Sequence, residues 1–299
     1  MRVSVLVCTR NRAGSLEATL RRFFAQRFAG GYEFELLVVD NASTDETKQV
    51  VERCVAQHPG LARYLFEQRR GLTYARNTGL LAARGEVIVF TDDDVLVSED
   101  WLDEIHREFA GNQSLRMLSG RVLLAGAELQ QVSLLQSDER ASFGLPDGVN
   151  FVMGANMAFR REVFDRIGLF DVRLGAGRFF AGSDDVELIY RGLKAGYKLL
   201  YAPNVLVHHN HDRVTLKQAC RLQYGYGKSC PAYLIKHSLG GDGYAMRMLY
   251  WTLLTLPERW RRKREEPDEA FIHRRWHVKG MLVGLCAAPF VMWGEGRQG

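Results

Sequence analysis

Short apolar runs alternate with stretches of helical spacing through the first 115 residues of the chain. The apolar runs, most of them rich in Val and Leu as buried strands are, occupy residues 3–8, 35–40, 63–68 and 86–91. The stretches with helical spacing occupy residues 15–28, 45–56 and 73–84. Strands that alternate with helices in this way predict an α/β fold, with a mostly parallel, Rossmann-type sheet flanked by helices on both faces.

The pattern changes twice after residue 115. Up to residue 215 we expect a helix at 185–195, a long loop or flap at 126–150, and strands at 116–124, 153–160, 198–201 and 205–208. Beyond residue 215, three stretches predict helices, at 216–226, 244–256 and 278–293. We therefore divide the chain into residues 1–115, residues 116–215, and a helical C-terminal appendage over residues 216–299.

Composition narrows the class of protein. Charged residues make up 25% of the chain and the net charge is only +5, which is too mild to indicate a nucleic-acid partner. The five cysteines are odd in number and form no CxxC pair, so we expect a reducing compartment and no disulfide framework. The N-terminal apolar run is too short for a signal peptide, so a cytoplasmic location is expected.

Polar residues follow three of the predicted strands. They are Thr9-Arg10-Asn11, Asp40-Asn41 and Asp92-Asp93-Asp94. Ligands of open α/β sheets bind at the carboxyl ends of the strands, so three polar strand ends indicate a pocket there. No P-loop and no GxGxxG sequence is present, which leaves a metal and arginines to hold phosphate; Arg10, Arg12 and Arg76 are the candidates.

The three aspartates are the most informative part of this pattern. Side chains alternate between the two faces of a strand, so Asp92 and Asp94 are expected to point to one side together. Two carboxylates placed in this way suit a hard divalent cation. A solvated acidic turn is the alternative for such a run taken alone.

Four blocks together resemble the family 2 glycosyltransferases. They lie at residues 5–12, 38–45, 71–79 and 91–94, where Asp92-Asp93-Asp94 corresponds to the DXD motif, and the resemblance covers about residues 1–230. Enzymes of this family have the GT-A fold, are inverting and metal-dependent, and use nucleotide-sugar donors. The resemblance therefore implies a nucleotide-sugar-binding half over residues 1–115 and an acceptor-binding, catalytic half over residues 116–215.

The resemblance also implies roles for the residues of the first half. Asp40 would accept a hydrogen bond from the base edge, most commonly uracil, and Arg76 would lie near the nucleotide. Asp92 would lie by the ribose and the sugar, and Asp94 would bind the metal. Asp93 would be structural or would contact the donor sugar. The residues that would line the base and ribose are Thr9, Arg10, Asn11 and Arg12.

The second half resembles the acceptor side of the family at residues 154–161, 168–171 and 182–188. Asp184 stands where the family has glutamate, one methylene longer, and Asp185 occupies the aspartate position. We favour Asp185 as the general base that deprotonates the acceptor hydroxyl, with Asp184 second. The alternative is that both are acidic groups favoured by the dipole of a helix N-terminus.

The resemblance also implies a histidine ligand for the metal at the end of the short strand 205–208. His208 fits this position best, with His209 and His211 as rivals, and a surface histidine cluster is the alternative. An imidazole ligand would favour Mn²⁺ over Mg²⁺.

The C-terminal appendage combines tryptophans with basic clusters. Four of the five tryptophans lie after residue 250, beside the clusters at 259–264 and 273–275. The apolar stretch 280–293 is shorter than the roughly 20 residues that span a bilayer. Tryptophan and arginine beside short apolar helices indicate a peripheral membrane contact through residues 244–293, and an ordinary packed helical subdomain is the alternative.

These observations predict a hexosyltransferase-type enzyme that moves a sugar from a nucleoside diphosphate, most commonly UDP, to a hydroxyl acceptor in a glycan or glycolipid. Synthesis of a surface polysaccharide or glycolipid is the expected setting. Two rivals stay open at this point. A nucleotidyltransferase would require a Gly-rich phosphate loop, and a non-catalytic nucleotide-sugar-binding subunit would not require a base.

Overall fold

The computed structural model describes residues 1–261 and 267–294. The chain forms two compact units, each built from two stretches of sequence. The first, which we call the sheet unit, comprises Met1–Asp171 and Asp185–Asp212. The second, which we call the helical unit, comprises Val172–Asp184 and Arg213–Gly299.

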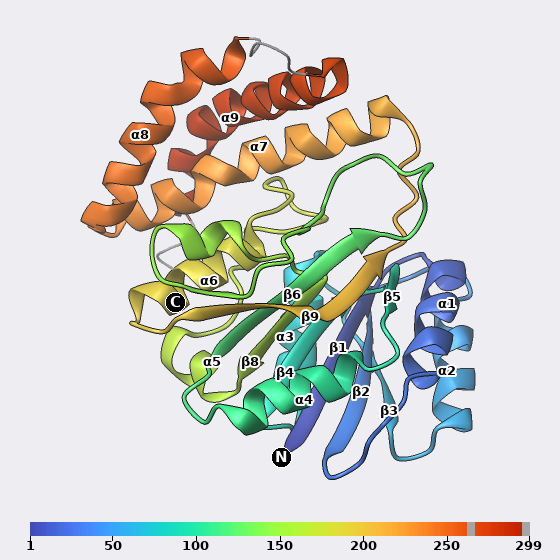
Figure 1. The fold of residues 1–299 in the computed structure, drawn as a ribbon. Coiled ribbons are helices and arrows are strands. Elements are labelled where there is room, and N and C mark those ends of the chain that lie inside the picture. The colour runs from blue at the N-terminus through green and yellow to red at the C-terminus, as the bar shows by residue number, and fades with distance from the viewer. Residues whose placement is uncertain (262–266, 295–299) are drawn as a thin grey trace. The chain divides into compact units, whose positions relative to one another are not determined.

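Within the described residues, nine strands form one sheet in the sheet unit (Figure 1). The strands are β1 (Arg2–Thr9), β2 (Glu33–Asp40), β3 (Ala62–Phe66), β4 (Val87–Asp92), β5 (Val95–Val97), β6 (Met117–Leu124), β7 (Ala141–Phe143), β8 (Asn156–Arg160) and β9 (Leu199–His209). Their order is β3-β2-β1-β4-β8-β6-β9-β5, with β7 paired to β9. The pairs β1–β2, β1–β4, β2–β3 and β6–β9 are parallel, whereas β8, β5 and β7 pair antiparallel to their neighbours. The mostly parallel α/β sheet that the sequence predicts is confirmed.

Helices flank the sheet on both faces. Those of the sheet unit are α1 (Ala13–Phe24), α2 (Thr47–Gln57), α3 (Leu72–Ala82), α4 (Trp101–Gly111), α5 (Glu162–Ile167) and α6 (Asp184–Lys194), whose first residue belongs to the helical unit. Alternate strand residues supply two separate cores. Val5 and Val7 of β1 pack with α1, α2 and α4, whereas Leu6 of the same strand packs with α3, α5 and α6. Because both faces of the strand are buried, apolar residues follow one another along a run such as Val5-Leu6-Val7.

The segment expected as a long loop or flap is more ordered than the sequence suggests. It contains β7 and a short 3-10 helix, Asp147–Asn150. The Tyr201 hydroxyl donates to the Ser137 carbonyl at 2.6 Å, and Arg140 forms a bidentate ion pair with Glu108 of α4. These contacts hold residues 137–143 against the sheet.

In the part of the helical unit that the structure describes, there are three long helices, α7 (Leu216–Leu239), α8 (Gly243–Trp260) and α9 (Asp268–Gly294). All three extend beyond the stretches that the sequence predicts. A capping box begins α7, in which the Thr215 side chain accepts from the Gln218 backbone and the Gln218 side chain accepts in return.

The segment Val172–Asp184 is part of the same unit. Gly182 lies so close to Tyr226 and Ser229 of α7 that an added Cβ would come within 2.8 Å of the Tyr226 ring. The Ser183 and Ser229 hydroxyls are hydrogen-bonded at 3.1 Å. This loop is therefore packed by side chains of α7.

Candidate active site

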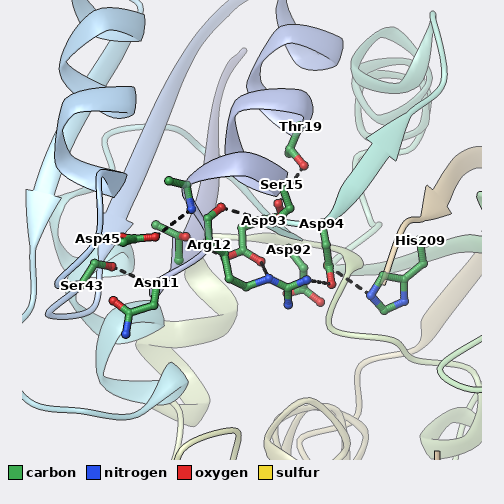
Figure 2. Close-up of polar contacts among 12 residues, drawn as sticks. Asn11, Arg12, Ser15, Thr19, Ser43, Asp45, Asp92, Asp93, Asp94 and His209 are labelled. Atoms are coloured by element: carbon green, nitrogen blue, oxygen red, sulfur yellow. Dashed lines mark hydrogen bonds and ion pairs between the residues drawn. The ribbon is translucent and has the colours of Figure 1, made fainter. Parts of the chain in front are cut away.

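Strand β4 ends at Asp92, and Asp93 and Asp94 form the turn into β5. The three side chains have different environments, and Figure 2 shows the polar contacts that Asp93 and Asp94 make with neighbouring residues. Asp92 is half-exposed, and its Oδ1 lies 3.4 Å from Nη2 of the buried Arg76. Asp93 and Asp94 are buried. The turn therefore presents one partly open carboxylate beside two enclosed ones.

Asp94 lies between a guanidinium and an imidazole. Arg12 Nη2 is 2.8 Å from Asp94 Oδ2, and His209 Nε2 is 3.2 Å from Asp94 Oδ1 (Figure 2). Burial opposes charging of the His209 ring, but the Asp94 and Asp92 carboxylates and the Ser133 carbonyl together raise the pKa of His209. The carboxylate is thus held by cationic or proton-bearing groups on both sides.

The contact of His209 Nδ1 determines whether Nε2 of the neutral ring can act as a metal ligand. His209 Nδ1 lies 3.3 Å from the Ser133 carbonyl oxygen, which can only accept, so Nδ1 holds a proton. In the neutral ring Nε2 then directs a lone pair at a carboxylate oxygen. Two acceptors in this position are stable only with a proton or a metal ion between them. A backbone carbonyl that fixes the tautomer in this way is a common support for a histidine metal ligand.

The residues present fit a divalent cation. Ligand atoms of Asp92, Asp94 and His209 all lie within 4.8 Å of one another. Two carboxylates and one imidazole suit Mn²⁺, and the oxygen ligands also suit Mg²⁺.

The structure changes the choice of histidine. The sequence favoured His208, but His209 is the residue beside Asp94. Strand β9 runs unbroken to His209, and its burial alternates so that His209 is in phase with the buried Val205 and Val207. His208 is out of phase and only half-buried. The third candidate, His211, is fully buried, with its ring edge-to-face against His209 at 5.1 Å.

Asp93 faces the start of α1 instead of the other two carboxylates. Its Oδ2 accepts from the Thr9 hydroxyl at 2.7 Å, and its Oδ1 lies 3.5 Å from Arg12 Nε. Its backbone carbonyl accepts from Thr19 at 3.0 Å. Burial raises the pKa of the Asp93 carboxyl to about 7, although Arg12 opposes this shift. These contacts tie the aspartate turn to the end of β1 and to α1.

A second group of predicted residues surrounds the loop after β2. Asp40 is buried and accepts from the Ser43 backbone and the Tyr64 hydroxyl, both at 2.9 Å. Asn11, at a left-handed φ of 52°, donates its backbone N–H to Ser43 Oγ at 2.9 Å. Its side-chain oxygen accepts from the Thr44 backbone at 2.7 Å. The loop that follows β1 and the loop that follows β2 are therefore locked together at the carboxyl edge, and Arg10 lies half-exposed in the first of them.

Arg76 and Asp185 meet at the backbone of Gly154. Arg76 is buried, and its Nη2 lies 3.3 Å from the Gly154 carbonyl, while its guanidinium packs near the Phe170 ring. The Gly154 N–H donates to Asp185 Oδ2 at 2.8 Å. Asp185 is partly exposed, whereas Asp184 is buried and belongs to the helical unit. Arg76 thus joins the Asp92 side of the site to the loop that holds Asp185.

Two contributors were missed by the sequence reasoning. The Ser133 carbonyl is a backbone group in a segment without a motif, so no sequence signal identifies it. Asn41 was noted only as part of a strand end, yet its side chain donates to the carbonyls of Glu67 and Arg69 and accepts from the Gly71 N–H at 2.8 Å. It therefore orders the loop that leads into α3.

Comparison with known proteins identifies the family of the chain. The model of glycosyl transferase family 2 matches residues 4–168, which is more than half of the chain, and that of glycosyl transferase family group 2 matches residues 87–293. Glycosyltransferase AglE of Haloferax volcanii is 26% identical over 214 residues, which cover 69% of this chain and 66% of that protein. Pre-mycofactocin glycosyltransferase of Mycobacterium tuberculosis is 25% identical over 242 residues, which cover 79% of this chain and 48% of that protein. The chain thus spans about half to two thirds of the length of these relatives.

Solved structures show the same fold. The mannosyltransferase PcManGT of Pyrobaculum calidifontis, solved in complex with GDP-Man and Mn²⁺, matches with a TM-score of 0.61 and 22% identity. The match covers 96% of this chain and 75% of that one. The mostly parallel sheet and the helices that flank it therefore have the GT-A fold. Together with the family match over residues 4–168, this establishes that the chain belongs to glycosyl transferase family 2.

Proposed function

We propose that this protein is a metal-dependent, inverting glycosyltransferase that moves a hexosyl group from a nucleoside diphosphate sugar to a hydroxyl acceptor. The observation that carries the proposal is the cluster of Asp92, Asp94 and His209, whose ligand atoms lie within 4.8 Å at the carboxyl edge of the sheet. Family 2 membership supplies the reaction class. The roles assigned to single residues below are part of the proposal.

Asp92, Asp94 and His209 would hold Mn²⁺ or Mg²⁺, and the imidazole favours Mn²⁺. The bound metal would stabilise the negative charge that develops on the departing diphosphate. The Ser133 carbonyl keeps the His209 ring oriented toward the carboxylates, at an Nδ1–O distance of 3.3 Å. Arg12 holds Asp94 in place at 2.8 Å and supplies a positive charge on the same side of the cluster.

Asp185 is our choice for the general base. Its carboxylate is partly exposed, and its two oxygens accept from backbone N–H groups at 2.8 Å, Oδ2 from Gly154 and Oδ1 from Val186. Inversion is a single displacement, so the base needs only to take the proton of the acceptor hydroxyl as that oxygen attacks. The base edge of the nucleotide, uracil in the first instance, would lie by Asp40, with Thr9, Arg10, Asn11 and Arg12 lining the base and ribose. Asp93 would support the turn, and Asp184 would stand second to Asp185.

The direct test is a panel of UDP- and GDP-sugars incubated with the protein and Mn²⁺, with and without EDTA. Release of nucleoside diphosphate from one donor, abolished by EDTA, is the expected result. Metal-dependent donor binding without release, even in the presence of hydroxyl acceptors, would instead indicate a non-catalytic nucleotide-sugar-binding subunit. Release that EDTA leaves unchanged would contradict the metal site.

Replacing the two neighbouring histidines separately tests the ligand set. We expect His209→Ala to weaken Mn²⁺ binding by about 10–100-fold, because it removes the imidazole that faces Asp94. His208→Ala is the matched control, since this residue lies on the same strand but out of phase with His209. For both variants, the Mn²⁺ affinity is measured by titrating Mn²⁺ and following donor binding. Equal losses in the two variants would remove His209 from the proposed site.

A glycan or glycolipid is the proposed acceptor, and synthesis of a surface polysaccharide or glycolipid is the proposed setting. The division of the sheet unit near residue 115 into a donor half and an acceptor half belongs to this proposal, because Asp185 lies in the second half and Asp40 and Asp92 in the first. The cytoplasmic location expected from the cysteine pattern remains a prediction.

A further inference from the structure

Two helices of the helical unit expose large apolar side chains on one face. On α8 the exposed apolar residues are Met246, Tyr250, Trp251, Leu253 and Leu254. On α9 they are Trp276, Leu282, Val283, Phe290 and Trp293. With 3.6 residues per turn, the members of each set fall on one side of their helix, so each set forms a stripe. We call these the α8 stripe and the α9 stripe.

The inner face of α9 is already occupied. Val278, Met281, Ala288 and Met292 are buried, on the side opposite to the α9 stripe. Gly280 and Gly284 bring the backbone of α9 against the α7 backbone at Tyr224 and Lys228, where an added Cβ would have no room. The helix therefore packs fully against α7 on one side and remains apolar on the other. A surface helix of a water-soluble unit is normally polar on its outer face, so these stripes mark a contact surface.

Charge identifies the partner. The helical unit contains 17 Lys and Arg against 8 Asp and Glu, a net charge of +9, in a chain whose total is +5. The sheet unit is therefore acidic, at −4. Two of the cations stand directly over tryptophan rings: Arg275 lies 4.4 Å from the Trp260 centroid, and Lys279 lies 4.6 Å from that of Trp276. Tryptophan beside Lys or Arg is the chemistry of the headgroup level of a bilayer, where the ring is buried and the cation meets phosphate.

We propose that the α8 and α9 stripes dock the protein on the surface of an anionic phospholipid bilayer, with both helices lying in the interface. Although α9 is long and apolar enough to cross a membrane by length and composition, a crossing does not fit its surroundings. Its uncharged part begins after Lys279 and is shorter than the roughly 20 residues that a span requires. It also packs along α7, which contains Lys217, Arg221, Lys228 and Lys236. This inference is independent of the proposed catalytic chemistry.

Vesicle flotation tests the proposal with the full-length chain. We expect the protein to float with vesicles that contain phosphatidylglycerol, to float less with phosphatidylcholine alone, and to be released in part by high salt. The double variant Leu282→Asp, Phe290→Asp should lower the partition coefficient at least about tenfold, because it places two carboxylates in the buried part of the contact. Leu81→Asp is the matched control, since Leu81 is an apolar side chain of α3 that is 72% exposed in the sheet unit. It should float like the wild type.

Tryptophan fluorescence provides a second measurement that needs no substitution. Trp251, Trp260, Trp276 and Trp293 are exposed, whereas Trp101 is fully buried in the sheet unit. Brominated acyl chains should therefore quench most of the tryptophan emission of the bound protein, and the remaining emission should come from Trp101. Circular dichroism shows whether each variant remains folded, and donor-dependent nucleoside diphosphate release shows whether it remains active. A failure of docking can therefore be distinguished from a failure of the catalytic proposal.

Three results of the vesicle experiments would overturn the proposal: no flotation of the wild type with anionic vesicles, equal flotation of the double variant, or flotation without quenching. A stable dimer in solution that the double variant dissociates would also overturn it, because a second copy would then cover the stripes.

Discussion

Asp185→Asn should lower turnover by about 10²–10⁴-fold and leave donor affinity unchanged, because an amide cannot take the proton of the acceptor hydroxyl. The substitution preserves the shape of the side chain. Its amide oxygen can still accept the Gly154 N–H, which now lies 2.8 Å from Asp185 Oδ2, whereas its NH2 group replaces Oδ1 and loses the bond from the Val186 N–H, also at 2.8 Å. The loop at Gly154 should therefore stay in place while basicity is lost. Single-turnover rates with saturating donor, together with calorimetric donor binding, measure the two effects separately.

Asp184→Asn is the matched comparison for this experiment. Asp184 precedes Asp185 directly but is buried, so its replacement should lower turnover much less. The reverse ranking of the two variants would assign the base to Asp184. Full activity in both would place the base outside this pair and would contradict the mechanism proposed above.

Asp94→Asn should lower turnover by about 10³-fold, since a bound metal supplies several kcal/mol of charge stabilisation to the departing diphosphate. Asp94 is the carboxylate that joins the cluster to both Arg12, at 2.8 Å, and His209, at 3.2 Å. Loss of its charge should therefore raise the Mn²⁺ concentration needed for half-maximal activity as well as lower the maximal rate. Initial rates over a Mn²⁺ series, at saturating donor, give both quantities.

The neighbouring Asp93 is the control for Asp94. Its carboxylate accepts from the Thr9 hydroxyl at 2.7 Å and is not one of the three clustered ligand groups. Asp93→Asn should thus leave the Mn²⁺ requirement close to that of the wild type, with any loss appearing in thermal stability. A shift of the Mn²⁺ requirement that is larger for Asp93→Asn than for Asp94→Asn would exchange the roles of the two residues.

The sheet was predictable because its strands are buried on both faces. Val5 and Val7 pack into one core and Leu6 into the other, so apolar residues occupy consecutive positions in such a strand, and the run differs from the helical spacing around it. The polar ends of β1, β2 and β4 were then enough to locate the carboxyl edge. Side-chain direction at that edge was harder to predict, since it depends on where each strand ends.

His208 and His209 illustrate the difficulty. The sequence predicts two short strands around residues 202–204, whereas the structure has a single strand β9 with an irregular register, in which Gly120 pairs with Ala202 and Arg121 with Leu206. A shift of one residue in a strand reverses which side chains face the site. The irregularity lies in the pairing of β9 with β6, which is far away in the sequence, so the unbroken course of β9 to His209 was not predicted from residues 198–208.

The contacts that join Arg76, Gly154 and Asp185 could not be predicted either, because these residues are far apart in the sequence. Motif resemblance placed Arg76 near the nucleotide, but it gave no account of burial. The structure places this side chain 4% exposed, with the Phe90 and Phe170 rings near its guanidinium. A guanidinium so enclosed suggests support for Asp92 and the Gly154 loop, in addition to any effect on the donor.

The discontinuous make-up of the helical unit has a consequence for how such enzymes can be recombined. Because Gly182 and Ser183 are packed against Tyr226 and Ser229 of α7, the loop before Asp184 and the C-terminal helices share one interface. A chimera that exchanged only the C-terminal helices with those of a relative would break this interface. Residues 172–184 would have to be exchanged together with the helices. The loop next to the proposed base and the C-terminal helices are therefore expected to be exchanged as one piece.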